Sequence, residues 1–211
     1  MKIPARVVAI FIIPMMVIPG CLSNTEIDDY YGDDINPPLA FQSFELVDQN
    51  NNSFSSESFA GKVVVIAFLF TNCPDICPIV SANLAYIAKE LGTDYGTEVE
   101  ILTITVDPWR DTWETLADYS EGRNLNWTHL TSNTIDENDQ YPELEAVWGD
   151  FGVGLSVVEA NGTSARHHPA AYEVDHSTGT IIIDRSGNQR IWWGDLDWAP
   201  ELVLQDIRAL M

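Results

Sequence analysis

The chain has 211 residues, of which 45% are hydrophobic, and its 32 Asp and Glu against 10 Lys and Arg give a formal net charge of −22. The apolar fraction excludes an acidic disordered tail, and the scarcity of cations excludes binding to nucleic acid or to anionic lipid through a basic patch. Three cysteines are too few for a disulfide-stabilised scaffold, so the positions of Cys21, Cys73 and Cys77 matter more than their number.

The N-terminus is typical of an export signal. Two cations, Lys2 and Arg6, precede an apolar run over residues 7–18, which is shorter than the roughly 20 residues of a membrane-spanning helix. We therefore predict a signal peptide over 1–20, a lipid-anchor cysteine at Cys21 and an acidic tether over 21–38. An uncleaved signal anchor is the alternative. Both place the protein outside the cytoplasm, at the outer face of the cytoplasmic membrane.

The first part of the folded region predicts a hairpin, a buried strand and a helix. Residues 44–47 and a polar turn at 48–52 predict the hairpin. The continuous apolar run KVVVIAFLF, residues 62–70, indicates a strand buried on both faces. Apolar residues at helical spacing then predict a helix that has Pro74 in its first turn and ends at Gly92.

The second part of the folded region is again predicted to contain both strands and helices. Residues 100–106 (EILTITV) predict another buried strand, and Asp111 with Glu114 predicts a capping box for a helix that runs to about Ser120. The remaining predictions are a short strand near 125–130, a helix over 143–150, strands over 171–174, 180–184 and 189–193, and a final helix over 200–210.

This order of elements predicts one α/β domain over residues 39–211. Parallel strands need crossover helices between them, and the late hairpin supplies antiparallel strands. The arrangement is that of a thioredoxin-like fold: a central mixed sheet flanked by helices, here with an N-terminal hairpin extension.

Two thiols carry the most specific chemical signal. Cys73 and Cys77 are four residues apart at the start of a predicted helix, so we expect both sulfurs on one helix face. The positive end of the helix dipole favours thiolate, and soft thiolates select soft metals, Cu(I) above all. Thiols at a strand–helix junction of an exported protein tend to oxidise, which argues against an inert core pair. The spacing alone leaves thiol–disulfide exchange and metal binding open.

A histidine is available to complete a metal site. His176 ends a predicted strand, and Asp175 and Ser177 beside it are possible hydrogen-bond acceptors for its ring. His167 and His168 lie in a segment without periodicity, which favours a surface loop over a second metal site. His129 is expected to be packed or at the rim of the fold.

Three motifs in this order resemble the SCO/SenC family of copper proteins: residues 71–78 (TNCPDICP), 105–112 (TVDPWRDT) and 172–177 (YEVDHS). The resemblance covers residues 39–210. It implies a thioredoxin-like fold on a membrane tether and a role in copper delivery to the binuclear CuA site of cytochrome c oxidase.

Carried over residue by residue, the resemblance implies that Cys73 and Cys77 are copper thiolates and that His176 is the third ligand; Asp175 is expected to support His176 because it lies beside it. The resemblance further implies that the bound ion is Cu(I) or Cu(II) and that the partner is the CuA-bearing subunit of a terminal oxidase. Residues 107–112 are expected to be structural: their aspartates can accept backbone N–H groups, and Arg110 can pair with a carboxylate.

The main hypothesis is therefore a membrane-tethered copper chaperone. Its alternative is a thiol–disulfide reductase that keeps the CuA cysteines reduced through the redox pair Cys73 and Cys77. A peroxidase is weaker, since no clear peroxidatic constellation is present. A non-catalytic exported surface module, suggested by sequons at Asn51, Asn126 and Asn161, leaves the thiols unexplained.

Overall fold

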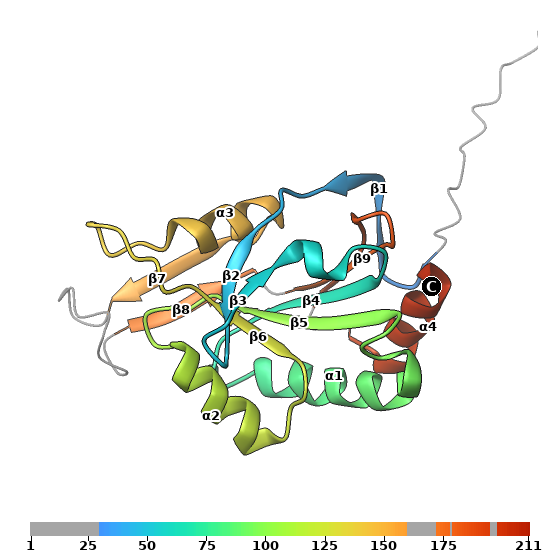
Figure 1. Ribbon diagram of the computed structural model, residues 1–211, viewed down its shortest axis with the longest axis horizontal. Coiled ribbons are helices and arrows are strands. Elements are labelled where there is room, and N and C mark those ends of the chain that lie inside the picture. Colours follow the sequence, from blue (N-terminus) through green and yellow to red (C-terminus); the bar gives the residue numbers. More distant parts are fainter. Residues whose placement is uncertain (1–29, 160–171, 178, 195–197) are drawn as a thin grey trace, which may run out of the picture.

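The computed structural model describes residues 30–159, 172–177, 179–194 and 198–211. Within these residues, an eight-stranded mixed sheet forms the centre of the molecule in the order β1-β10-β9-β4-β5-β6-β2-β3, and β7 and β8 form a separate two-stranded sheet (Figure 1). The strands are β1 (Asp33–Ala40), β2 (Glu45–Asp48), β3 (Ser53–Ser55), β4 (Val63–Leu69), β5 (Val99–Thr105), β6 (Thr128–Thr131), β7 (Leu155–Glu159), β8 (Tyr172–His176), β9 (Gly179–Ile183) and β10 (Asn188–Gly194). The helices are α1 (Cys77–Leu91), α2 (Trp113–Arg123), α3 (Pro142–Asp150) and α4 (Pro200–Leu210), with short 3₁₀ turns η1 (Ser56–Phe59) and η2 (Gly92–Asp94).

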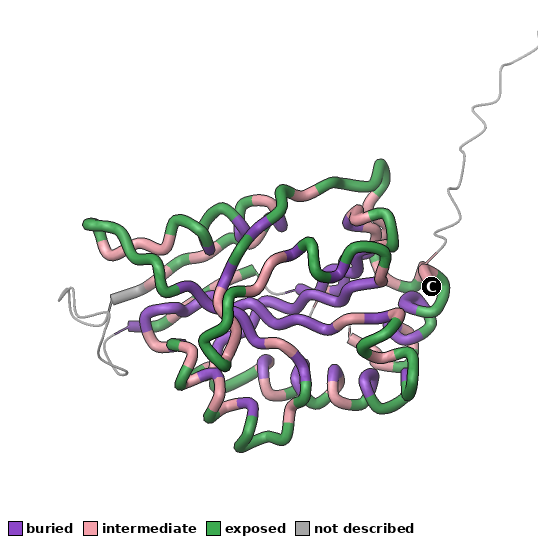
Figure 2. The backbone as a smooth tube through the Cα atoms, viewed as in Figure 1, coloured by how far each residue is buried: buried purple, intermediate pink, exposed green. Residues whose placement is uncertain are grey.

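The core lies around β4 and β5, which run parallel from the pair Val63 and Val99 to the pair Leu69 and Thr105. Every residue of β4 is buried, as its unbroken apolar sequence predicts (Figure 2). The order β4-α1-β5-α2-β6 places three parallel strands side by side with crossover helices between them. The predicted α/β fold with its mixed sheet and its β2–β3 hairpin is confirmed.

The helices cover both faces of this sheet. Helices α1 and α4 pack together on one side, and α3 lies on the opposite side (Figure 1). Because β4 and β5 are parallel, the loops that follow them leave from the same edge of the sheet. The thiol motif follows β4 and the aspartate motif follows β5, so the topology brings the two motifs together.

One predicted boundary needs correction. Residues 33–38, interpreted as part of the tether, belong to the edge strand β1, which pairs antiparallel with β10. The folded region therefore extends back at least to Asp33. Polar and proline-rich composition is compatible with an edge strand, since one side of its backbone needs no partner.

The segment before β1 is fastened by a carboxylate of the last helix. Asp206 is buried and accepts hydrogen bonds from the backbone N–H groups of Tyr31 and Gly32, each at 2.9 Å, and from Nε1 of Trp193 at 3.0 Å. Gly32 is required by this contact, because a Cβ atom there would lie 2.5 Å from Nε1 of Trp193. One acid thus joins the start of the domain to its end.

Asp206→Ala is expected to lower the free energy of unfolding by about 2 kcal/mol, because three donors lose a charged acceptor and one of them is buried. Urea denaturation measures the change. The control is Gln205→Ala on the exposed face of the same helix, which should change stability by less than about 0.5 kcal/mol. Equal stability of Asp206→Ala and wild type would contradict the assignment.

Two local predictions are also wrong in detail. The cap of α2 is Thr112, whose side chain accepts from the N–H of Thr115, and not Asp111. The side chain of Asp111 is buried instead and is hydrogen-bonded to Thr71 and Thr105. The strand predicted near 125–130 is β6, which begins only at Thr128. No helix among the described residues is long and apolar enough to cross a bilayer.

Candidate metal centre

The two thiols lie at the junction between β4 and α1, but in different environments. Cys73 is half-buried in the turn after β4, where its N–H donates to the carbonyl of Phe70 at 3.3 Å. Cys77 is the first residue of α1 and is buried. The expectation that both sulfurs share one helix face is wrong, because Pro78 and not Pro74 occupies the first helical turn, and the helix therefore begins after Cys73.

Cys77 faces a small polar group between α1 and α2. Ser81, one turn further along α1, is hydrogen-bonded to the hydroxyl of Tyr119 at 3.1 Å. Burial raises the pKa of Tyr119, and the nearby Cys77 adds to the rise. Cys73 and Cys77 are not joined in a disulfide. The outer thiol, Cys73, is therefore the one that an approaching group meets first.

His176 lies at the end of β8 with its ring edge-on to Phe70, at a centroid distance of 5.7 Å. Its Nδ1 lies 3.2 Å from the carbonyl oxygen of Ser177, which favours a proton on Nδ1 and leaves the lone pair of Nε2 available. Burial lowers the pKa of His176, which favours the neutral ring. A neutral imidazole is the form that binds metals.

Phe70 contacts two of the three predicted ligands. Its carbonyl accepts a hydrogen bond from the N–H of Cys73, and its ring packs against His176. Among the described residues, no three His, Cys, Asp or Glu side chains converge closely enough to hold a metal ion. The predicted ligands thus share one edge of the fold but would have to move closer together to bind one ion.

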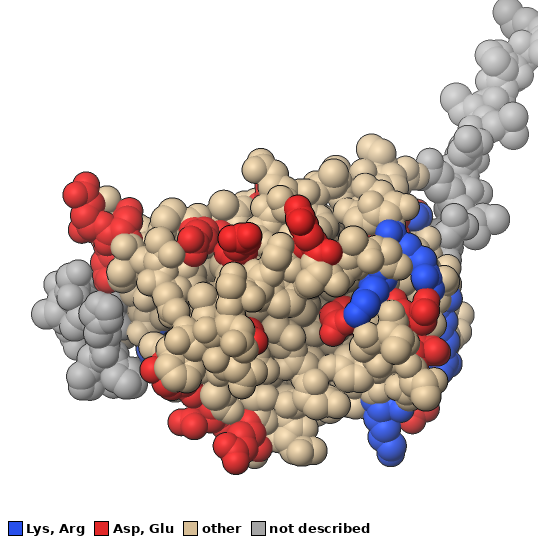
Figure 3. Space-filling model, in the orientation of Figure 1, with Lys and Arg blue, Asp and Glu red and all other residues tan. Residues whose placement is uncertain are grey.

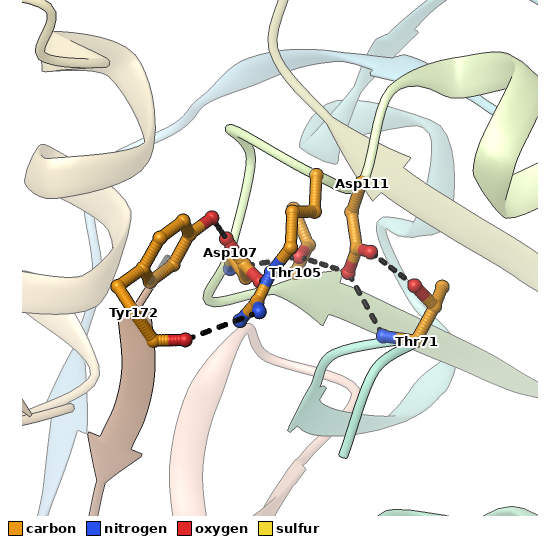
Figure 4. A network of polar contacts seen from close by, with 6 residues as sticks. Thr71, Thr105, Asp107, Asp111 and Tyr172 are labelled. Atoms are coloured by element: carbon orange, nitrogen blue, oxygen red, sulfur yellow. Dashed lines mark hydrogen bonds and ion pairs between the residues drawn. The ribbon is translucent and has the colours of Figure 1, made fainter. Parts of the chain in front are cut away.

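A buried carboxylate fixes the loop that carries the thiols. Asp111 accepts hydrogen bonds from the N–H of Thr71 at 3.0 Å, from the hydroxyl of Thr71, and from the hydroxyl of Thr105 at 2.7 Å (Figure 4). Thr71 is two residues before Cys73. The expected structural role of residues 107–112 thus takes the form of a clamp on the thiol loop.

A second group joins the loop after β5, which also holds Asp111, to the strand of His176. Asp107 is buried, pairs with Arg110 and accepts a hydrogen bond from the hydroxyl of Tyr172, the first residue of β8 (Figure 4). Arg110 lies 4.1 Å from the ring centroid of Tyr172. Burial raises the pKa of Asp107 against the opposing effects of Tyr172 and Arg110. Sequence reasoning predicted the pairing of Arg110 with a carboxylate but not the part played by Tyr172.

Asp111 predicts a measurable pH dependence. Burial raises its pKa to about 6, against the lowering effect of the bonds from Thr71 and Thr105. Because the folded chain holds this proton more tightly than the unfolded chain, the contribution of Asp111 to stability is fully present below about pH 4 and is lost as the pH rises through about 6. Relative to Asp111→Asn, which does not titrate, wild type should lose on the order of 2 kcal/mol between these pH values.

The comparison is made by denaturant unfolding of both proteins at a series of pH values. Asparagine can keep the bonds, because its oxygen can accept from Thr71 N–H and Thr105 while its amide donates to the Thr71 hydroxyl. Parallel stability curves for the two proteins would contradict the raised pKa.

A groove of about 470 Å³ lies between the turn after β4 and strand β8. The turn after β4 forms one wall, with Asn72 and Pro74, and β8 forms the other, with Glu173 and Val174. Phe70, Arg110 and Tyr172 complete the lining. The groove gives a second molecule access to the region between the thiol loop and the strand of His176.

Other candidate residues lie elsewhere. His129 is packed in the core as expected, hydrogen-bonded through Nδ1 to Thr103 at 2.6 Å, and burial lowers its pKa to about 4. Asp175 is exposed, and its charge acts on His176 only by raising the pKa slightly against burial. Cys21, His167 and His168 lie outside the described residues.

The chain is similar in sequence and in fold to known copper-related proteins. The family model described as SCO1/SenC matches residues 33–211. An SCO2-like protein of Rickettsia prowazekii is 33% identical over 146 residues, which make up 68% of this chain but 64% of the relative, less than two thirds of its length. Among solved structures, Bradyrhizobium japonicum ScoI with copper bound is 25% identical with a TM-score of 0.67, covering 82% of this chain and 99% of the other. Yeast Sco1 with copper bound is 27% identical with a TM-score of 0.66, covering 82% and 88%.

Proposed function

The chain belongs to the SCO1/SenC family, and from this premise we propose that it is a membrane-tethered, extracytoplasmic copper chaperone that delivers copper to the CuA site of a haem-copper oxidase. The observation that supports the proposal is that Phe70 contacts both Cys73, through its carbonyl, and His176, through its ring, while Cys77 begins the helix that follows. Two thiolates and one imidazole form a donor set that suits copper. The copper-bound relatives support the same cargo.

Copper is the cargo, and the residues of this chain determine how it is held and released. Cys73 is accessible, so it can meet incoming copper or the thiol of a partner, whereas Cys77 and the Nε2 atom of His176 supply the inner donors. Release proceeds by ligand exchange, in which each lost Cu–S bond is replaced by a bond to a partner cysteine. Oxidation of the pair to a disulfide removes two electrons and two protons from the thiols and abolishes binding.

The third ligand is tested by visible absorption. Wild-type reduced chain loaded with one equivalent of Cu(II) is expected to show a thiolate-to-copper charge-transfer band, and His176→Ala is expected to lose it, because Cu(II) favours nitrogen donors more than Cu(I) does. The matched control is His168→Ala, which should keep the band. Full retention of band and stoichiometry in His176→Ala would refute the ligand assignment.

A thiol–disulfide reductase is the second candidate, and the unequal exposure of the two thiols favours it. An accessible Cys73 can attack a partner disulfide, and a buried Cys77 can then resolve the mixed disulfide, so both electrons go to the partner. Cys77→Ser should trap a mixed disulfide at Cys73 if this reaction occurs. If no mixed disulfide forms with a CuA-type peptide whose two cysteines are joined in a disulfide, this would count against the reductase. His176 distinguishes the candidates, since copper binding needs it and dithiol exchange does not.

The location follows from the same proposal. A lipid on Cys21 would hold the domain at the outer face of the membrane, with residues 22–32 as the connecting segment. Mass spectrometry of the membrane-extracted protein tests this anchor. A diacylglycerol-sized addition lost in Cys21→Ser is the expected result, whereas an unmodified N-terminus with residues 1–20 retained would favour the signal anchor.

A further inference from the structure

Strand β8 has one edge without a partner strand among the described residues. It pairs with β7 only, in an antiparallel register in which Val174 lies opposite Val157 and His176 opposite Leu155. The N–H of Ser177 donates to the carbonyl of Gly154 at 2.8 Å, so this next pair is a hydrogen-bonded one. Hydrogen-bonded and non-hydrogen-bonded pairs alternate along an antiparallel ladder.

The alternation decides which backbone groups face outward. Asp175 and Glu173 form hydrogen-bonded pairs with β7, whereas Tyr172, Val174 and His176 direct their N–H and C=O groups away from it. A separate contact agrees with this assignment, because the carbonyl of Tyr172 accepts a hydrogen bond from the Arg110 guanidinium at 3.4 Å. The peptide groups of Val174 therefore lie at a strand edge that pairs with no other strand in the described part of the chain.

This edge forms one wall of the groove between β8 and the turn that carries Cys73. Tyr172, Glu173 and Val174 line one side of the space of about 470 Å³, and Asn72 and Pro74, the two neighbours of Cys73 in the chain, line the other. A strand paired to β8 here would thus run along the turn that carries Cys73. The exposed carboxylates of Asp75, Glu173 and Asp175 make the rim acidic, and the cation in the lining, Arg110, is paired with Asp107. The acidic side chains in Figure 3 likewise extend over the end of the molecule that carries α2 and α3.

We propose that the outer edge of β8 is a docking site for an extended, basic, cysteine-bearing segment of a partner polypeptide, which adds to β8 as a further strand and so brings its thiol to Cys73. Main-chain hydrogen bonds to Val174 supply the attachment, and the acidic rim selects a basic segment. The biological role of this docking site, which is to bring a partner thiol to Cys73, rests on the proposed function. The binding of the segment to β8 itself needs no copper.

The test uses a short capped peptide with the sequence Lys-Thr-Val-Thr-Cys-Thr-Val-Thr-Lys, supplied as its mixed disulfide with thionitrobenzoate. The full chain carrying Cys21→Ser and Cys77→Ser is used, so that the Cys73 thiolate displaces thionitrobenzoate and retains the peptide. No other oxidant is needed. Amide hydrogen exchange is then followed residue by residue in the copper-free adduct.

Exchange at Val174 and His176 is expected to slow at least about tenfold, while Glu173 and Asp175, already paired with β7, keep their rates. A second peptide, N-methylated at the alternate residues that face β8, should give the same adduct without this protection, and methylation of the other set should leave it intact. Unchanged exchange at Val174, or equal effects of the two methylated peptides, would overturn the proposal.

The acidic rim has its own control. In the same background, Glu173→Lys should slow the displacement of thionitrobenzoate by the peptide about fivefold at low salt, because steering is lost. Glu90→Lys, an exposed site at the far end of α1, should leave the rate unchanged. Equal rates for the two variants would contradict the charge argument. A wild-type chain that binds copper while the adduct shows no protection would refute the docking site alone, whereas protection without copper binding would refute the proposed function alone.

Discussion

Replacing Cys73 and Cys77 together by serine is expected to lower the Cu(I) affinity of the reduced chain by on the order of 10³-fold or more, because serine hydroxyls do not replace soft thiolates as ligands for Cu(I). Competition with a Cu(I) chelator measures the affinity. The control is Cys21→Ser, which removes the third cysteine of the sequence and should leave the affinity unchanged.

Folding of the double variant must be checked, since Cys77 is fully buried. Serine at this position has nearby hydroxyl partners in Ser81 and Tyr119, so we expect a cooperative unfolding transition close to that of wild type. A folded double variant that keeps full Cu(I) affinity would remove the basis of the proposed function.

Asp107→Ala is expected to lower the free energy of unfolding by about 3–5 kcal/mol, because it leaves the nearly buried Arg110 without its carboxylate and Tyr172 without its acceptor. Urea denaturation measures the loss. Asp118→Ala, which removes an exposed carboxylate on α2, should change stability by less than about 0.5 kcal/mol.

The same variant should also weaken copper binding where it still folds. Asp107 joins the loop after β5 to the first residue of β8, and β8 ends in His176. Loss of this contact therefore loosens the strand of the third ligand from the loop whose Asp111 binds the thiol loop. A variant with wild-type stability would contradict the paired, buried state of Asp107.

The fold was predictable where one residue pattern determined one structure. The apolar run of β4 allows only a strand buried on both faces, and Gly92 ends α1 with a positive φ of 57°. Proline at the start of α3 and of α4 marked those helices in the same way. Each of these signals comes from residues that are neighbours in the chain, so it can be recognised without knowing the tertiary structure.

The errors arose where two local signals competed or where the partner was distant. Pro74 and Pro78 both suit a first helical turn, and only the fold shows that α1 begins at Cys77, with Pro78 in its first turn. Asp111 resembled a helix N-cap because Glu114 follows it at the capping-box spacing. Its hydrogen-bond partners are instead Thr71, just after β4, and Thr105, the last residue of β5. Strand β1 depends on β10, whose residues are about 150 positions further along the chain.

In the candidate site too, the local features were predictable and the contacts between distant residues were not. The types of donor at Cys73, Cys77 and His176 were evident from the motifs, and these residues remain a prediction for the ligand set. The contacts around them were not evident, because they join residues far apart: Tyr172 to Asp107, the ring of His176 to Phe70, and Asp206 to the segment before β1. Nor can a residue pattern show that one edge of β8 is open, since this depends on which strand lies beside it.

The most direct measurement of the central claim is X-ray absorption of the reduced, full-length chain loaded with one equivalent of Cu(I). The proposed site predicts two sulfur neighbours and one nitrogen neighbour, with the nitrogen lost in His176→Ala and both sulfurs lost in Cys73→Ser/Cys77→Ser. A copper ion surrounded only by oxygen or nitrogen in the wild-type chain, or an unchanged spectrum in either variant, would contradict the account.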